Sequence, residues 1–353
     1  MYKKLFLIHF LICIKEIVLC KTNKTMLSCL YTISHTYTER GGSNVNQIFT
    51  MFIIYVSLFI FGMTVMRQGL LHIQKEKMSL WLQKAVDTPF KSMISGIIVT
   101  SILQSSSAVM IMTVGLVAAK ILPFRNSIGI ILGANIGTVI TLEILAFELT
   151  WLIFPFLLIG LPLLLTRNQL LFCIGCFFFG FGSILVAMNG FEKLAYPLSS
   201  LSIIYEWLLS TNNFQTVAVS VGVVMSAIIQ SSSAVTAIAM SFMNEELLYL
   251  PAGIAIMLGA NIGTCTTAWL ASLGGSREAK LTAYAHIWLN VTGVILFFPF
   301  INLFSQLIEL TSAQPSLQLA HAALVFNVLT SLIVLPFVAH FARFVQWIHK
   351  TSL

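Results

Sequence analysis

Two short polar motifs, each present twice at one spacing, constrain the fold of this chain more than any other feature. The first motif, QSSSAV, occupies Gln104–Val109 and recurs at Gln230–Val235. The second, GANIGT, occupies Gly133–Thr138 and recurs at Gly259–Thr264, and the same number of residues separates the two copies of each motif. Two further pairs share this spacing, namely Gly96 with Gly222 and Thr100 with Ser226. The chain therefore contains a duplicated unit.

The segments that surround these motifs are strongly apolar. Hydrophobic residues make up 58% of the chain, charged residues only 9%, and the mean hydropathy is +0.94. A soluble domain averages about 25% charged residues, so this chain must use lipid as its solvent. The formal charge of +7 comes from basic residues in short gaps between apolar segments. Because they do not gather on a polar face, no nucleic-acid partner is expected.

Apolar stretches that approach the roughly 20 residues of a membrane crossing predict seven spans. We place these spans at 49–71, 126–147, 150–166, 169–189, 251–273, 280–302 and 317–341. Two further apolar segments, 90–119 and 214–243, are each broken near the middle by a QSSS cluster. Each is too long for one crossing and too short for two, so we expect a re-entrant helical hairpin. Residues 1–50 are either a signal-like segment or an upstream extension, and they are left out of the fold prediction.

The distribution of basic residues predicts how these elements are oriented. If the loop after the first span is cytoplasmic, every Lys and Arg beyond residue 50 except Lys193 falls on the cytoplasmic side. The C-terminus is then cytoplasmic, and the two hairpins enter from opposite faces. The predicted fold is an all-α polytopic membrane protein of two inverted-topology repeats, 51–189 and 190–353. Such repeats with broken helices are typical of transporters whose sites lie near the midplane.

The polar clusters suit a small anion and a hard cation. At each QSSS turn, free N–H groups at a helix N-terminus attract an anion, and serine hydroxyls can donate to an anion or offer oxygens to a cation. The GANIGT segments add side-chain oxygens from Asn135, Thr138, Asn261 and Thr264, of the kind that Na⁺ needs. Their glycines would also suit close packing between helices. Asn290 and Asn327 could likewise serve only to form hydrogen bonds between helices. Glu143 is the acidic residue well inside a predicted span, which makes it a functional candidate.

Paired QSSSA and GANIGT motifs in an inverted repeat resemble the type II sodium–phosphate cotransporter family in its compact bacterial form. The resemblance covers roughly residues 51–345 and implies sodium-driven uptake of inorganic phosphate. It implies phosphate binding by Gln104, Ser105, Ser106, Ser107, Gln230, Ser231, Ser232 and Ser233. It implies sodium binding by Ser106, Ser107, Asn135, Thr138, Ser232, Ser233, Asn261 and Thr264. Secondary candidates are Thr100, Ser226, Glu143, Asn290 and Asn327. Some relatives add a C-terminal regulator-like domain, which is not expected here because the chain ends at Leu353.

The sequence therefore predicts a multi-pass symporter of the plasma membrane that carries Na⁺ and phosphate by alternating access, without a permanently bound cofactor. Its same-class rival carries another small anion, such as a dicarboxylate, arsenate or sulfate. We see no arginine near the hairpin tips to hold a carboxylate, which favours phosphate. A channel-like or signalling protein on the same scaffold is the rival of a different class. An enzyme is not expected, because the sequence offers no nucleophile–base pair or metal cluster. A homo-oligomer, the sodium stoichiometry and the direction of transport stay open.

Overall fold

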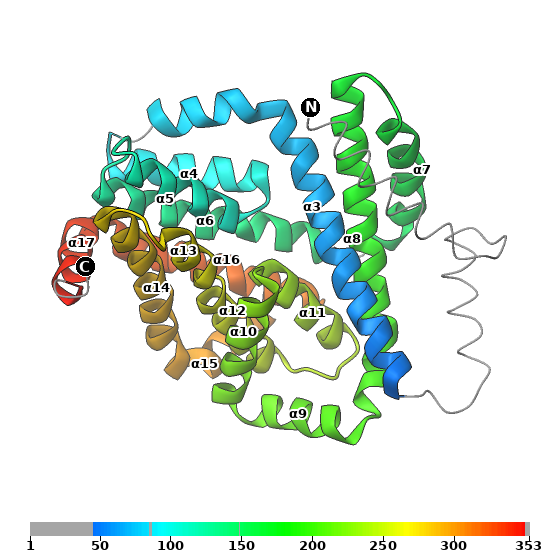
Figure 1. Cartoon of the computed structure of the whole chain (residues 1–353). Coiled ribbons are helices and arrows are strands. Elements are labelled where there is room, and N and C mark those ends of the chain that lie inside the picture. Colours follow the sequence, from blue (N-terminus) through cyan, green and yellow to red (C-terminus); the bar gives the residue numbers. More distant parts are fainter. Residues whose placement is uncertain (1–44, 85–86, 148, 350–353) are drawn as a thin grey trace. The chain divides into compact units, whose positions relative to one another are not determined.

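The computed structural model describes residues 45–84, 87–147 and 149–349, and the regular secondary structure of these residues is helical (Figure 1). The α-helices are α3 Val45–Lys84, α4 Pro89–Leu103, α5 Ser106–Ala118, α6 Phe124–Leu145, α7 Ile153–Leu164, α8 Gln169–Ser199, α9 Ser202–Asn213, α10 Gln215–Ile229, α11 Ser232–Asn244, α12 Leu250–Gly263, α13 Cys265–Ser272, α14 Arg277–Phe297, α15 Ile301–Glu309, α16 Pro315–Val334 and α17 Val338–Ile348. Single 3₁₀ turns precede α7, α15 and α17. Contacts divide the chain into two units, Met1–Thr50 and Met51–Leu353.

Six stretches are long and apolar enough to cross a membrane, so the chain is a multi-pass membrane protein. They are Val45–Leu70, Phe124–Leu145, Gln169–Ser199, Leu250–Ser272, Arg277–Glu309 and Pro315–Ile348. These six confirm six of the seven predicted spans. The prediction for 150–166 is not confirmed as a span, because its helical part, Thr150–Leu164, is too short. The segment 1–50 was interpreted as a signal or an extension; its residues 1–44 lie outside the described residues, and its last six residues begin α3.

One stretch that could serve as a seventh span was not predicted. Helices α9 and α10 pass the same test together, but they are bent by 118° at the break between them. The sequence of α9, SIIYEWLLSTNN, mixes polar and apolar residues, and its exposed side chains include Tyr205 and Trp207. Aromatic residues of this kind are enriched where a membrane meets water.

The predicted hairpin segments each form two short helices. Residues 90–119 fold as α4 and α5, and residues 214–243 fold as α10 and α11 (Figure 1). All four helices are shorter than the roughly 20 residues that a crossing requires, since α4 and α10 have 15 residues and α5 and α11 have 13. Each pair breaks inside its QSSS cluster, which is where the sequence predicted the turn.

The first arm of each pair packs in backbone contact with the helix that carries a GANIGT motif. A methyl group added at Gly133 of α6 would overlap the carbonyl oxygen of Met93 in α4. One added at Gly259 of α12 would overlap the carbonyl oxygen of Val219 in α10 in the same way. Glycine at these positions therefore lets two helices approach more closely than any side chain would permit.

The second GANIGT motif differs from the first in its backbone. Helix α6 runs without a break through the first copy, whereas α12 ends at Gly263 and α13 starts at Cys265. Hydroxyls follow the second copy: Thr266 Oγ1 donates to the Gly263 carbonyl at 2.9 Å, and Thr267 Oγ1 donates to the Thr264 carbonyl at 2.8 Å. Such side-chain bonds compete with the helical ladder. The helix is therefore interrupted next to the second copy of the motif and not at the first.

Candidate functional site

The two hairpin tips have the same local structure. Gln104 ends α4 in the left-handed region (φ 52°, ψ 35°), and Ser105 then caps α5 by accepting a hydrogen bond from the Ala108 N–H at 3.1 Å. Gln230 ends α10 with φ 57° and ψ 31°, and Ser231 caps α11 in the same manner at 3.2 Å. The serine caps satisfy one N–H of each helix N-terminus. Each tip therefore presents the positive end of a helix dipole beside hydroxyl groups.

The tips meet each other. Ser107, in the first turn of α5, donates a hydrogen bond of 3.3 Å from its Oγ to the backbone carbonyl of Gln230. These residues lie in different copies of the motif, so this bond joins the two halves of the duplicated sequence.

A small polar cavity lies between the copies, with a volume of about 10 Å³. That volume is close to one probe sphere, which is the space that a single water-sized particle needs. Its lining contains six of the eight residues predicted to bind sodium, together with Asn327. The full lining is Ser106, Asn135, Thr138, Val139, Leu142, Ser232, Thr236, Met257, Asn261, Thr264, Ala323 and Asn327.

The polar groups of this small cavity are neutral and are held in place by neighbouring groups. Asn135 Nδ2 donates to Asn290 Oδ1 at 3.1 Å, which leaves its own Oδ1 as an acceptor. The Thr138 hydroxyl donates to the Ala134 carbonyl at 2.8 Å. Asn327 Nδ2 donates to the Ala323 carbonyl at 2.8 Å. Hydroxyl and amide oxygens without a carboxylate can coordinate a hard cation, and the absence of a charged ligand makes its release easier.

A second, larger cavity of about 580 Å³ is also lined by residues of both tips. Three predicted phosphate-binding residues line it: Ser107, Gln230 and Ser231. Arg67 of α3 lines it as well. The sequence-based statement that no arginine lies near the tips is therefore wrong. That statement failed because Arg67, which belongs to α3, lies far from both motifs in the sequence and comes near them only in the fold.

Some predicted residues take no part in either cavity lining. Gln104 is engaged within its own half, where it accepts a hydrogen bond from the Thr141 hydroxyl and donates to the Ser101 carbonyl at 2.5 Å. Ser105 acts as a helix cap, and the side chain of Ser233 is buried in α11. Asn290 does not line the small cavity; its Oδ1 accepts the hydrogen bond from Asn135 Nδ2.

Thr100 and Ser226 form an equivalent pair behind the two tips. Both side chains are fully buried, and neither hydroxyl has a hydrogen-bond partner in the described part of the chain. The backbone carbonyls of the same two residues accept the N–H groups of Gln104 and Gln230 at 2.7 and 2.8 Å. A buried hydroxyl without a partner has a desolvation penalty, and here it occurs at the same position of both copies.

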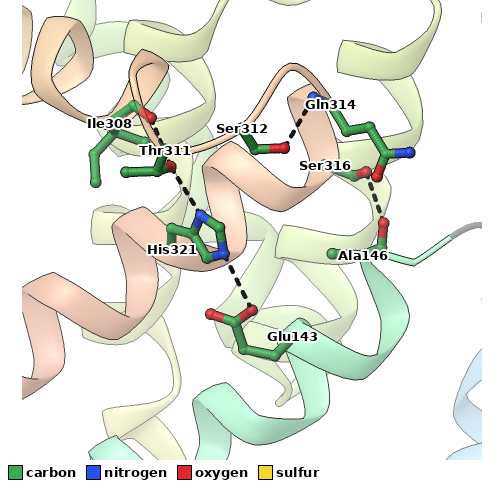
Figure 2. A network of polar contacts seen from close by, with 8 residues as sticks. All are labelled: Glu143, Ala146, Ile308, Thr311, Ser312, Gln314, Ser316 and His321. Carbon is green, nitrogen blue, oxygen red and sulfur yellow. Dashed lines mark hydrogen bonds and ion pairs between the residues drawn. The ribbon is translucent and has the colours of Figure 1, made fainter.

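Glu143 lies in a separate polar network near the end of α6 (Figure 2). Its Oε2 is 3.7 Å from Nε2 of His321 in α16, and His321 Nδ1 shares a hydrogen bond of 2.8 Å with the Thr311 hydroxyl. Glu143 lines neither cavity at the tips. The network joins α6 to the α15–α16 turn.

Sequence reasoning missed three residues around the tips. Thr236 lines the small cavity, Thr141 holds the Gln104 amide, and Arg67 lines the large cavity. A usable signal existed for Arg67, because Ile60, Thr64 and Arg67 follow the spacing of one helix face and all line the large cavity.

Comparison with known protein families finds one match that covers most of the chain. The family model described as Na+/Pi-cotransporter matches residues 58–193 and 201–333. No solved structure matches the chain.

Individual relatives give the same picture. The uncharacterized protein YqeW of Bacillus subtilis is 39% identical over 299 residues, which are 85% of this chain and 97% of the relative. The putative inorganic phosphate export protein YjbB of Escherichia coli is 24% identical over 294 residues, which are 83% of this chain and 54% of YjbB, so the chain spans about half of that relative. The sodium-dependent phosphate transport protein 2A of Ovis aries is 34% identical over 86 residues, 23% of this chain and 14% of the relative.

Proposed function

The chain belongs to the Na+/Pi-cotransporter family, whose members are membrane transporters and not enzymes, and from this premise we propose that it carries inorganic phosphate together with Na⁺. The observation that carries the proposal is the meeting of the two QSSS tips. One hydrogen bond joins them, and residues of both tips line a small neutral cavity and a larger cavity with donor groups. A cation and an anion then bind close enough for each to strengthen the binding of the other.

In this proposal the small cavity is the sodium site. Its size suits one ion without its water shell, and its ligands are Ser106, Asn135, Thr138, Ser232, Asn261 and Thr264. Phosphate occupies the larger cavity, where Ser107, Gln230 and Ser231 present hydroxyl and amide donors. Two helix N-termini point their partial positive charges toward the same contact.

We also propose that the two halves, 51–189 and 190–353, are inverted repeats whose relative rocking gives alternating access. The equivalent packing of α4 on α6 and of α10 on α12 supports this arrangement. In it, the two short helix pairs are re-entrant hairpins that enter from opposite faces of the plasma membrane, and the C-terminus is cytoplasmic. The single bond between the tips is weak enough to break in each transport cycle.

The direction of net transport divides the proposal into two candidates. Sodium-driven uptake is the first candidate; the names of the family and of the sodium-dependent phosphate transport proteins support its sodium coupling. Phosphate export is the second candidate, because YjbB is named as a putative export protein. The same site serves both, and the imposed ion gradients decide the direction.

Radiolabelled phosphate flux in proteoliposomes tests the proposal. Vesicles with an inward Na⁺ gradient should accumulate phosphate, and vesicles with a matched K⁺ gradient should not. Ser232→Ala, which removes a hydroxyl from the small cavity, should raise the half-saturating Na⁺ concentration by about tenfold. Ser241→Ala is the matched control, since it removes a buried hydroxyl from the same helix beyond the tip.

Two results would contradict the proposal. A wild-type protein that moves no phosphate in either direction under either gradient would remove phosphate as the substrate. Equal flux with Na⁺ and K⁺ would remove sodium coupling while keeping phosphate transport. Vesicles preloaded with phosphate that release it only when the Na⁺ gradient is directed outward would support export as the direction of net transport.

A further inference from the structure

Arg67 is a charged side chain near the C-terminal end of the apolar stretch Val45–Leu70 of α3. We propose that it is the fixed positive charge that binds the transported anion in the large cavity, an assignment that rests on the proposed function. The site is then selective for small oxyanions that present two acceptor oxygens on one face. Phosphate, arsenate and sulfate belong to this class, and a small dicarboxylate can enter it through one carboxylate group.

Arg67 lines the same large cavity as residues of both tips. Ile60, Thr64 and Arg67 stand one turn apart on α3 and line the cavity together. Ser107 and Ser231 line the same cavity from the first and second tips. The guanidinium therefore belongs to the cavity in which both QSSS motifs present their hydroxyls.

Among the described residues, no carboxylate pairs with the charge of Arg67. Arg67 is the one charged residue that the structure describes in the cavity lining. Its Nε is buried and has no hydrogen-bond partner among the described residues. An unpaired cation in a membrane-embedded segment has a large desolvation penalty. A bound anion would offset that penalty, so the unpaired charge favours anion binding in this cavity.

The chemistry of arginine defines what it would bind. Its planar guanidinium offers parallel N–H donors that match two oxygens of a phosphate or a carboxylate. Lysine has the charge but not this geometry. The serine hydroxyls of the tips then add neutral donors to the remaining oxygens. An anion with a tetrahedral centre can use both sets of donors at once, whereas a flat carboxylate uses mainly the arginine.

The test compares three variants of the purified full-length protein in proteoliposomes. Arg67→Gln should raise the half-saturating phosphate concentration by about 10- to 100-fold, because hydrogen bonds to a charged group are being removed. Arg67→Lys should give a smaller increase. Arg343→Gln, which changes an arginine on α17 away from both cavities, should leave the value unchanged. An Arg67→Gln protein with the wild-type half-saturating concentration overturns the assignment.

A binding measurement separates this inference from the proposed function. If wild type transports no phosphate, thermal unfolding is followed in phosphate, arsenate, sulfate and succinate, since a ligand stabilises the state that binds it. Stabilisation of wild type by any of these anions that Arg67→Gln loses supports the role of Arg67. No stabilisation of wild type, or equal stabilisation of both proteins, overturns it. If Arg67→Gln does not fold, Arg67→Lys decides: a raised half-saturating concentration supports the role, and the wild-type value refutes it.

Discussion

Gly133→Ala, with Gly115→Ala as its control, tests whether backbone contact holds the first hairpin arm on α6. Both changes replace a helical glycine by alanine, which favours a helix by about 1 kcal/mol. At Gly115 of α5 the new methyl group meets nothing within 4 Å, so no steric clash offsets the gain in helix stability. At Gly133 it overlaps the Met93 carbonyl oxygen and lies 2.7 Å from the Ile97 nitrogen. Both atoms are backbone, so no side-chain rotation relieves the clash.

Overpacking of this kind costs about 1–3 kcal/mol, and a clash with backbone places Gly133→Ala near the upper end. We therefore expect Gly133→Ala to lower the free energy of unfolding by about 1–2 kcal/mol and Gly115→Ala to raise it by up to about 1 kcal/mol. Thermal unfolding of the purified proteins in detergent should show midpoint shifts of opposite sign. At this chain length each kcal/mol corresponds to roughly 2 °C or less. Shifts of the same sign, or a Gly133→Ala protein as stable as wild type, would refute the packing argument.

Three further predictions concern groups outside the two cavities. Thr100→Val removes a buried hydroxyl that has no partner, so we expect unchanged or slightly higher thermal stability; a loss of phosphate transport at unchanged stability would show that the hydroxyl binds a ligand. Glu143→Gln removes the 3.7 Å pair with His321, which should cost less than about 1 kcal/mol of stability and leave the half-saturating phosphate concentration unchanged. Burial lowers the pKa of His349, whose Nε2 accepts the Trp288 indole N–H at 3.0 Å only when unprotonated. The neutral ring therefore stabilises the fold above about pH 6.5, and this stability declines as the pH falls below that value. In His349→Gln, the midpoint temperature of unfolding should vary less with pH between about pH 5 and 7 than in wild type.

The sequence was most informative where a polar cluster interrupts an apolar segment. The turns at Gln104 and Gln230 were predicted correctly, because burying four consecutive polar residues in an apolar segment costs free energy that helix packing alone does not require. The gathering of Asn135 and Asn261 in one small cavity also followed from the repeat. These features depend on local composition and on the duplicated spacing, both of which are visible in a single chain.

Other features depend on neighbours that one sequence does not reveal. Arg67 was counted with the basic residues of the cytoplasmic side, because a charge-based rule assigns such residues to membrane edges and does not recognise one that lines a cavity. The helix α9 was missed, since its mixed polar and apolar residues lack the signal of a buried span. The break at Thr264 depends on hydroxyl bonds that follow the motif, and the motif itself is identical in both copies.

The short hairpin arms also have a consequence for how the protein is made. Helices α4 and α5 leave the ribosome before α6, which supplies the backbone surface on which α4 packs. If α4 and α5 form the re-entrant hairpin proposed above, the polar tip at Gln104 and Ser105 would face hydrocarbon until α6 arrives, which an unsatisfied backbone cannot tolerate. Membrane insertion of the hairpin should therefore wait for α6, so that α4, α5 and α6 enter the bilayer as one unit. Helices α10, α11 and α12 face the same requirement in the second half of translation.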